Sequence, residues 1–496
     1  MSDRPNLVLF MPDQLRADAV GCFGSTVAQT PVIDALAARG ARFDHAYVQH
    51  SVCSPSRASI FTGWYPHVAG HRSLTHLLKP WEPNLLRSLK VAGYTVAWVG
   101  QRGDTFAPGV VAESTDFHGF LVEPAVFLEA SPHPPDSPWQ GAFYHGRRQA
   151  PPGEVVLDFD EATVRTAEAW LASSPPEPWV LLVALVFPHP PFAVEDPWFS
   201  MHDRRDMPPP ARWVPDGKPR YMHELRRRSG TGQLGADAWA EIAAVYHGMT
   251  SRVDWQLGRV LEAVDLAGAS ERTVTFFFPD HGEYLGDHGL VEKWPSGQHD
   301  SLLRNPLVVA GPGVAEGVVV DPMVELVDLL PTCIELAGTE ARHTHFGRSL
   351  VPLLAGKVED HRDLAFSEGG FLVAEEHLLE RSPAPYATKS AIQHEDPVTV
   401  GRVVSVRDQR WTYVHRLYEG PELYDRRTDP HETVNVAGRP GSADVELRLR
   451  DEVLRWLLET ADVLPWDTDP RFEPEFTELV TRQVKARRAA ARGGEP

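Results

Sequence analysis

Thr273-Val-Thr-Phe-Phe-Phe278 is a short run of β-forming residues that ends abruptly at the polar stretch Pro279-Asp280-His281. Three further runs share this pattern, at 7–11 before Asp13-Gln14, at 94–99 before Gly100, and at 180–187 before Pro188-His189. Continuous apolar runs of this length are typical of parallel strands buried on both faces. Helical patterns lie between them at 31–39, 84–92, 159–172 and 236–267. The alternation predicts a doubly wound α/β sheet, in which ligands bind beyond the carboxyl ends of the strands.

The pattern changes after about residue 365. Two alternating runs at 401–407 and 410–415 predict antiparallel strands, and an amphipathic helix is expected at 443–460. We therefore predict a large domain over residues 1–365 and a smaller C-terminal α+β domain over residues 366–496. Two Pro-rich stretches, 131–153 and 203–235, are expected to be long surface excursions.

Composition limits the possible partners. The chain has 496 residues with 48 Lys and Arg against 68 Asp and Glu, a formal net charge of −20. This charge argues against binding to nucleic acid or to an anionic membrane. The apolar run near the N-terminus is too short for a signal peptide or membrane helix, so a cytoplasmic protein is expected. Three cysteines, Cys22, Cys53 and Cys333, argue against a disulfide framework.

The segment Ser51-Val-Cys53-Ser-Pro-Ser-Arg57 carries the strongest chemical signal. Ser54 can cap a helix whose first residue is Pro55. Arg57 follows Cys53 by four residues, so a helical path places its guanidinium on the same face. A helix N-terminus and a bidentate cation together predict an anion site for a sulfate or phosphate group.

These residues also resemble a known family. Cys53-Ser-Pro-Ser-Arg57 matches the Cys-X-Pro-X-Arg signature at which sulfatases have their cysteine oxidised to formylglycine. Further family-like segments lie at 12–14, 30–40, 278–289 and 422–435. The chain thus resembles the sulfatase branch of the alkaline phosphatase superfamily. The resemblance implies an alkaline-phosphatase-like fold, with a large mixed sheet flanked by helices.

The resemblance also implies one divalent metal ion, held by Asp13, Gln14, Asp280 and His281. The two carboxylates and the amide oxygen suit calcium, whereas the imidazole of His281 suits manganese or zinc. Many sulfatases have asparagine at that position, while phosphonate monoester hydrolases have histidine. The identity of the metal is therefore left open.

Catalytic roles follow from the same resemblance. Cys53, converted by a formylglycine-generating enzyme, would be the nucleophile, and Arg57 would hold the developing charge. His189 and Lys293 resemble the residues that bind sulfate and protonate the leaving group. The family's Gly-Lys-Trp-His segment is replaced here by 100–104, Gly-Gln-Arg-Gly-Asp. His76 and Arg102 are therefore candidates for substrate contacts.

Three functions compete at this point. The first is a sulfuric ester hydrolase acting on a small-molecule or saccharide sulfate ester. The second is a phosphonate monoester or phosphodiester hydrolase, favoured by His281 and by the missing Lys-Trp-His. The third is a non-catalytic anion-binding protein whose Cys53 is never converted. The sequence does not predict an oligomeric state.

Overall fold

The computed structural model describes residues 4–100, 103–126, 130–150, 153–357, 361–466, 471 and 474–492. These residues form a nine-stranded sheet in which eight strands follow the order β10-β2-β9-β8-β1-β6-β3-β4 and β11 pairs with β2. The strands span Asn6–Asp13 (β1), Ala41–Tyr47 (β2), Thr95–Val99 (β3), Phe117–Gly119 (β4), Trp179–Pro188 (β6), Thr273–Phe277 (β8), Arg304–Ala310 (β9), Val318–Val320 (β10) and Val324–Glu325 (β11). β1 runs parallel to β6 and β8, whereas β9 runs antiparallel to β8 and β2. The predicted mixed sheet is confirmed.

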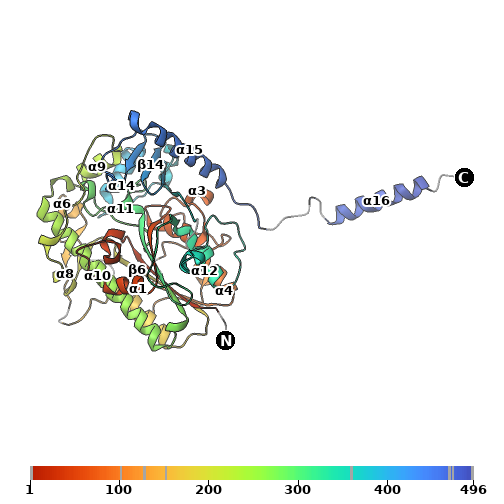
Figure 1. Cartoon of the computed structure of the whole chain (residues 1–496), viewed down its shortest axis with the longest axis horizontal. Coiled ribbons are helices and arrows are strands. Elements are labelled where there is room, and N and C mark those ends of the chain that lie inside the picture. The colour runs from red at the N-terminus through yellow and green to blue at the C-terminus, as the bar shows by residue number, and fades with distance from the viewer. Residues whose placement is uncertain are drawn as a thin grey trace.

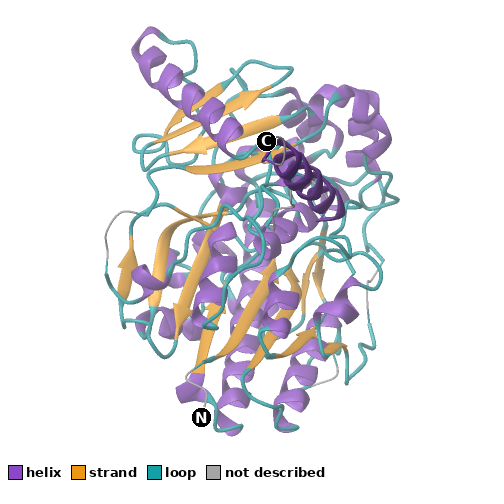
Figure 2. Ribbon diagram, turned by 90° about the vertical axis from the view of Figure 1, so that its right-hand side faces the viewer, coloured by secondary structure: helices purple, strands orange, loops and turns teal. Residues whose placement is uncertain are grey.

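Both faces of this sheet are covered by helices (Figures 1 and 2). Alternate residues of β1 belong to two separate cores, with Leu7 in one and Val8 in the other. The first core includes residues of α2 (Cys53–Thr62), α4 (Leu85–Val91) and α12 (Leu329–Leu336). The second includes residues of α1 (Pro31–Ala38), α7 (Phe159–Ala172) and α10 (Ala236–Leu266). Because successive strand residues point to opposite faces, a strand covered on both sides is expected to be almost continuously apolar.

The Pro-rich excursions contain more structure than the sequence predicts. The first holds α6 (Pro138–Gly141) and β5 (Tyr144–Arg147), and β5 pairs with β7 (Phe192–Val194). The second holds α9 (Arg220–Arg228), whose Tyr221 and Met222 are buried in the first core. Tyr221 and Leu225, four residues apart and so on one face of α9, both pack in this core. The other α-helices of the described residues are α3 (Pro66–Ala69), α5 (Val110–Ser114), α8 (Trp198–Met201), α11 (Asp300–Leu303), α13 (Val351–Leu354), α14 (Ala387–Glu395), α15 (Ala443–Glu459) and α16 (Pro474–Arg492), and short 3-10 helices lie between them.

A small antiparallel sheet follows the large one in the chain. Its strands, in spatial order, are β12 (Ala365–Gly369), β13 (Val403–Arg407), β14 (Trp411–Arg416) and β15 (Glu422–Asp425). α15 packs on β13 and β14 through Leu449, Val453 and Trp456. The expected smaller α+β unit is therefore present, and Figure 2 shows it stacked on one end of the large sheet. Within the described ranges, no helix combines the length and apolar character that crossing a membrane requires.

Glu368 ties the small sheet to the rest of the molecule. This buried carboxylate on β12 accepts hydrogen bonds from the backbone and ring nitrogens of His67, at 2.8 and 2.7 Å, and from Arg402 at 2.8 Å. Burial raises the pKa of Glu368, but Arg402 and His67 outweigh that effect and lower it to about 2.

This pKa predicts a loss of stability in acid. A carboxyl group with a lowered pKa stabilises the fold above its unfolded pKa of about 4.3, and that stabilisation disappears as the pH falls towards 2. We expect Glu368 to contribute about 3 kcal/mol at neutral pH, of which about 2 kcal/mol is lost by pH 3. The free energy of unfolding, measured with urea from pH 7 to pH 3, should fall more steeply with decreasing pH in the wild type than in Glu368→Gln. An equal fall in the two proteins would contradict this role of Glu368.

Candidate active site

The central strands β1, β6 and β8 are neighbours and run parallel, so their carboxyl ends share one edge of the sheet. Asp13 ends β1, Asp280 follows β8, and His189 follows β6. Asp13 and Asp280 are fully buried, whereas 17% of the His189 side chain is exposed. The sequence prediction that polar strand ends meet in one place is thus correct for these three residues.

The helix that carries Cys53 begins earlier than the sequence predicts. Val52 is extended and Ser56 N donates to Val52 O at 3.0 Å, so Cys53 is the first helical residue and Ser54 is not the cap. Pro55 stands in the first turn, where the missing N–H has no intrahelical partner to lose. The sulfur of Cys53 therefore lies at the helix N-terminus, and the residue is 7% exposed.

The Arg57 guanidinium is the centre of a buried ion-pair network. Its Nε donates to Asp280 Oδ2 at 2.8 Å and its Nη2 to Asp13 Oδ2 at 3.0 Å. Its Nη1 donates to both carboxylate oxygens of Asp104 at 3.0 Å. A ligand atom of Asp104, Cys53 and Asp13 each lies within 4.8 Å of the other two. Arg57 thus links carboxylates at or after the ends of β1, β3 and β8, next to Cys53.

Asp13, Asp280 and His281 fit the demands of a divalent cation. Their candidate ligand atoms lie within 4.8 Å of one another. His281 Nδ1 lies 2.9 Å from Gly282 O, which can only accept, so Nδ1 carries the proton and Nε2 presents a lone pair. This Nε2 is buried, makes no hydrogen bond to any described residue, and lies 3.6 Å from Asp13 Oδ1 and 3.8 Å from Asp280 Oδ1. Burial, the largest influence, lowers the pKa of His281 and favours the neutral ligand form.

Gln14 lies beside this cluster but is engaged elsewhere. Its backbone N donates to Asp280 Oδ1 at 3.1 Å, and its side-chain nitrogen donates to Glu283. Its amide oxygen accepts a hydrogen bond from Lys293 Nζ at 2.5 Å. The structure therefore brings Lys293 to the predicted metal ligands. The role of Gln14 as a ligand stays a prediction.

A second set of charges surrounds Lys293. Glu292 Oε1 lies 3.0 Å from Lys293 Nζ and 4.0 Å from His189 Nε2. Lys389 Nζ, from α14, donates to Glu292 Oε2. Burial alone would lower the pKa of Lys293, but Glu292 outweighs it and raises that pKa. Lys293 is therefore a permanent cation at neutral pH.

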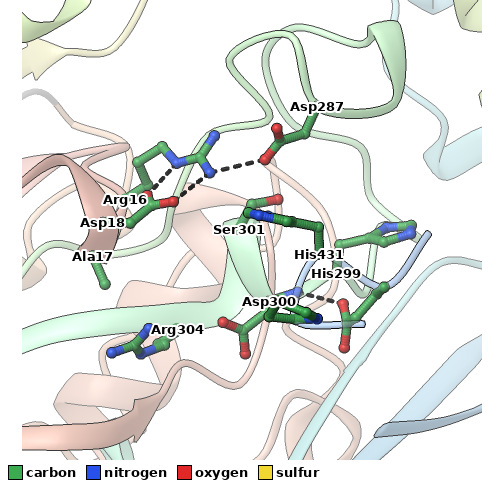
Figure 3. A pocket seen from close by; sticks show the side chains of 11 residues that line it. Arg16, Ala17, Asp18, Asp287, His299, Asp300, Ser301, Arg304 and His431 are labelled. Atoms are coloured by element: carbon green, nitrogen blue, oxygen red, sulfur yellow. Dashed lines mark hydrogen bonds and ion pairs between the residues drawn. The ribbon is translucent and has the colours of Figure 1, made fainter. Parts of the chain in front are cut away.

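Arg16 braces the loops that hold these groups. Figure 3 shows its guanidinium between Asp18 and Asp287, at 2.5 and 2.8 Å, and it also donates to Tyr284 O at 2.9 Å. These contacts join the segment after β1 to the segment after β8. Arg16, Asp18 and Asp287 line a cavity of about 180 Å³ that His299 and Arg304 also border. Arg16 thus links the segment that follows Asp13 to the segment that follows Asp280.

Sequence reasoning missed Asp104, Glu292 and Lys389. Asp104 follows β3 and is a strand-end carboxylate like Asp13, so the same rule could have found it. Arg102, predicted from that segment, lies outside the described residues. His76 is held within its own loop, where its backbone N lies 3.2 Å from Ser73 Oγ and its carbonyl 2.7 Å from His71 Nδ1. No described contact brings His76 to Cys53, so its role in substrate binding stays a prediction.

Comparison with known proteins identifies the family. The sulfatase family model matches residues 5–339. The chain belongs to the sulfatase family. The prediction of a sulfuric ester hydrolase with an alkaline-phosphatase-like fold is thereby confirmed.

Three relatives of this sulfatase illustrate its range. The multifunctional alkaline phosphatase superfamily protein PehA of Trinickia caryophylli is 28% identical, over 92% of this chain and 96% of its own length. A Delta 4,5-hexuronate-2-O-sulfatase of Bacteroides thetaiotaomicron is 26% identical, over 95% and 92%. The crystal structure of the phosphonate monoester hydrolase of Agrobacterium radiobacter has a TM-score of 0.71 and 26% identity, over 92% and 96%. The family therefore includes relatives named for different esters.

Proposed function

We propose that this enzyme hydrolyses sulfate esters through a formylglycine formed from Cys53, with one divalent metal ion beside it. The observation that carries the proposal is the convergence of Cys53, Arg57, Asp13, Asp280 and His281 at one sheet edge. The nucleophile lies at a helix N-terminus, beside a buried guanidinium and the His281 Nε2 lone pair that can bind a cation. This setting suits attack on an anionic ester.

The chain's own residues divide the work. Asp13, Asp280 and His281, with Gln14 beside them, would hold the ion, which supplies positive charge to the ester oxygens. Calcium suits the carboxylates, and the Nε2 of His281 favours manganese or zinc. Arg57 and Lys293 hold the negative charge of the substrate.

Cys53 supplies the nucleophile after its oxidation by a formylglycine-generating enzyme. The hydrated aldehyde has two hydroxyls, one for attack on sulfur and one for release of sulfate. A small-molecule or saccharide sulfate ester is the proposed substrate. A cytoplasmic location and a division of the chain near residue 365 remain predictions from the sequence.

Phosphonate monoesters and phosphodiesters are the second candidate substrates. The similarity to the phosphonate monoester hydrolase and to PehA supports this alternative, as does His281. A protein that binds anions without turnover is the third possibility.

The test is a screen of sulfate, phosphonate and phosphate esters with enzyme whose conversion at Cys53 has been measured. Sulfate turnover is expected to dominate. Faster hydrolysis of phenyl phosphonate esters would favour the alternative, and binding without turnover after full conversion would favour the third.

Of the two predicted acids, His189 and Lys293, we propose that His189 protonates the leaving group. Its Nδ1 lies 2.6 Å from Pro190 O, which can only accept, so Nδ1 keeps its proton and Nε2 is the atom that gains or gives one. An alkyl alcohol needs that proton, whereas an activated aryl alcohol hardly does. We expect His189→Ala to slow alkyl sulfates about 10²-fold or more and aryl sulfates much less.

Lys293→Met is the matched comparison for His189→Ala. Because Lys293 holds charge on the anion itself, its loss should slow alkyl and aryl esters by similar factors. The ratio of kcat/KM for the two ester types separates these roles. If His189→Ala slows both types equally, His189 binds the anion and does not protonate the leaving group.

A further inference from the structure

Glu292 is a buried carboxylate on an unusual backbone. Its φ angle is 67°, in the left-handed region, and the residue is 1% exposed. Residues with a Cβ atom rarely adopt this backbone conformation, whereas glycine adopts it without strain. Strained residues persist only where the surrounding structure holds them, and they gather at functional sites. Here the backbone N of Glu292 donates to Glu283, and its side chain is held by cations.

The carboxylate of Glu292 lies among three basic groups. One oxygen is 3.0 Å from Lys293 Nζ and 4.0 Å from His189 Nε2. The other accepts hydrogen bonds from Lys389 Nζ and, at 2.8 Å, from Lys293 N. Burial raises the pKa of Glu292, but Lys293, Lys389 and His189 outweigh it and lower it to about 2. Glu292 is therefore ionised throughout the working range of an enzyme.

This arrangement reduces the positive charge that the site offers to an anion. Lys293 reaches the predicted metal ligands through Gln14, but Glu292 is paired with the same ammonium group. Arg57 is likewise matched by carboxylates, including Asp104, whose side chain is 21% exposed. Arg57 and Lys293 are thus each paired with carboxylates before a substrate arrives.

Ester classes differ in the charge that such a site must accommodate. A sulfate monoester, a phosphonate monoester and a phosphodiester each carry one negative charge at neutral pH. A phosphate monoester carries about two above its second pKa of about 6. A nearby fixed carboxylate repels the doubly charged group about twice as strongly.

We propose that Glu292, held in place by Lys389, is a specificity-determining residue that makes the anion site select singly charged esters over doubly charged phosphate monoesters. The inference rests on the proposed function, because it assumes that the ester anion binds beside Lys293. Removing one carboxylate charge a few ångström from the anion should shift the preference about tenfold or more.

Four variants test the sign of this effect. Glu292→Gln removes the charge and keeps the size, while Glu292→Gly removes the charge and suits the left-handed backbone. Lys389→Gln removes a cation and should shift the preference the opposite way. The double variant Glu292→Gln with Lys389→Gln restores the balance of charge. The control is Glu177→Gln, which removes a carboxylate paired with Arg272 at 2.9 Å, before β6 and β8 at the opposite edge of the sheet.

Two measurements read the preference. The first is the ratio of kcat/KM for p-nitrophenyl phosphate and p-nitrophenyl sulfate at pH 8, where the phosphate ester is doubly charged. The second is the ratio of calorimetric Kd values for inorganic sulfate, which is doubly charged, and methyl sulfate, which is singly charged. The binding ratio needs no turnover. A wild type that hydrolyses no sulfate ester would end the proposed function, while the binding ratio would still decide the role of Glu292.

The expected result is a shift of about tenfold or more towards the doubly charged ligand in Glu292→Gln and Glu292→Gly alike. Lys389→Gln should shift the other way, and the double variant and Glu177→Gln should stay within about threefold of the wild type. Unchanged ratios in folded Glu292→Gln and Glu292→Gly would overturn the proposal. Opposite shifts in those two variants would also overturn it, because the backbone and not the charge would then set the preference. If Glu292→Gln does not fold, Glu292→Gly and Lys389→Gln carry the test.

Discussion

Replacing Cys53 by alanine should lower kcat/KM for sulfate esters by at least about 10⁴-fold while the protein stays folded. Cys53 is the first residue of α2, and its sulfur lies within 4.8 Å of candidate ligand atoms of Asp13 and Asp104. Without an attacking group at this point, the charges around it can bind an ester but cannot split its hydrolysis into two steps. Steady-state kinetics with an aryl sulfate and a thermal unfolding curve measure both parts of the prediction.

Two further measurements sharpen this result. Mass spectrometry of the wild-type peptide that contains Cys53 should find formylglycine, in proportion to the specific activity of each preparation. Cys333→Ala, which removes a thiol buried in the first core, should keep the activity of the wild type. Full activity in protein whose Cys53 is an unmodified thiol would end the formylglycine mechanism.

Asp280→Ala should lose the metal ion and the activity together, with a fall in kcat/KM of about 10³-fold or more. Asp280 is fully buried and faces His281 Nε2 at 3.8 Å, and its other oxygen accepts from Arg57 Nε. Its loss removes one anionic ligand and also the acceptor of the hydrogen bond from Arg57 Nε. Elemental analysis after dialysis measures the bound metal independently of turnover.

Asp104→Asn is the matched control for Asp280→Ala. Asp104 also binds Arg57, but it is not among the predicted ligands, so this variant should keep the metal. Full metal occupancy in Asp280→Ala would show that the ligand assignment is wrong. Loss of metal in Asp104→Asn would place the ion nearer to Cys53 than we propose.

The central sheet could be predicted because its signal is local. The runs that become β1, β3, β6 and β8 consist mostly of apolar and β-branched residues, and a polar residue or glycine follows each within two positions. Burial on both faces demands such runs, and the carboxyl ends of parallel strands must meet at one edge. Asp13, His189 and Asp280 were placed at that edge by this rule.

The rest of the site depends on contacts between distant segments. Lys389 lies on α14, in a region where the sequence offers an ordinary amphipathic pattern and no motif. Its contact with Glu292 is decided by how the second part of the chain packs on the first, which periodicity does not report.

The start of α2 was predicted two residues late because proline favours the first helical position but is accepted anywhere in the first turn.

The pairing of Glu292 with Lys389 also has a consequence for the order of events during synthesis. The two residues are 97 positions apart in the chain. At about 5–20 residues per second, Glu292 leaves the ribosome roughly 5–20 s before its partner does. A nascent chain that ends before α14 contains this carboxylate but not Lys389. All the other charged groups of the candidate site lie at or before residue 293 and are already present. Lys389 is therefore the last charged group of the candidate site to be synthesised, and it belongs to the part of the chain that also builds the small sheet.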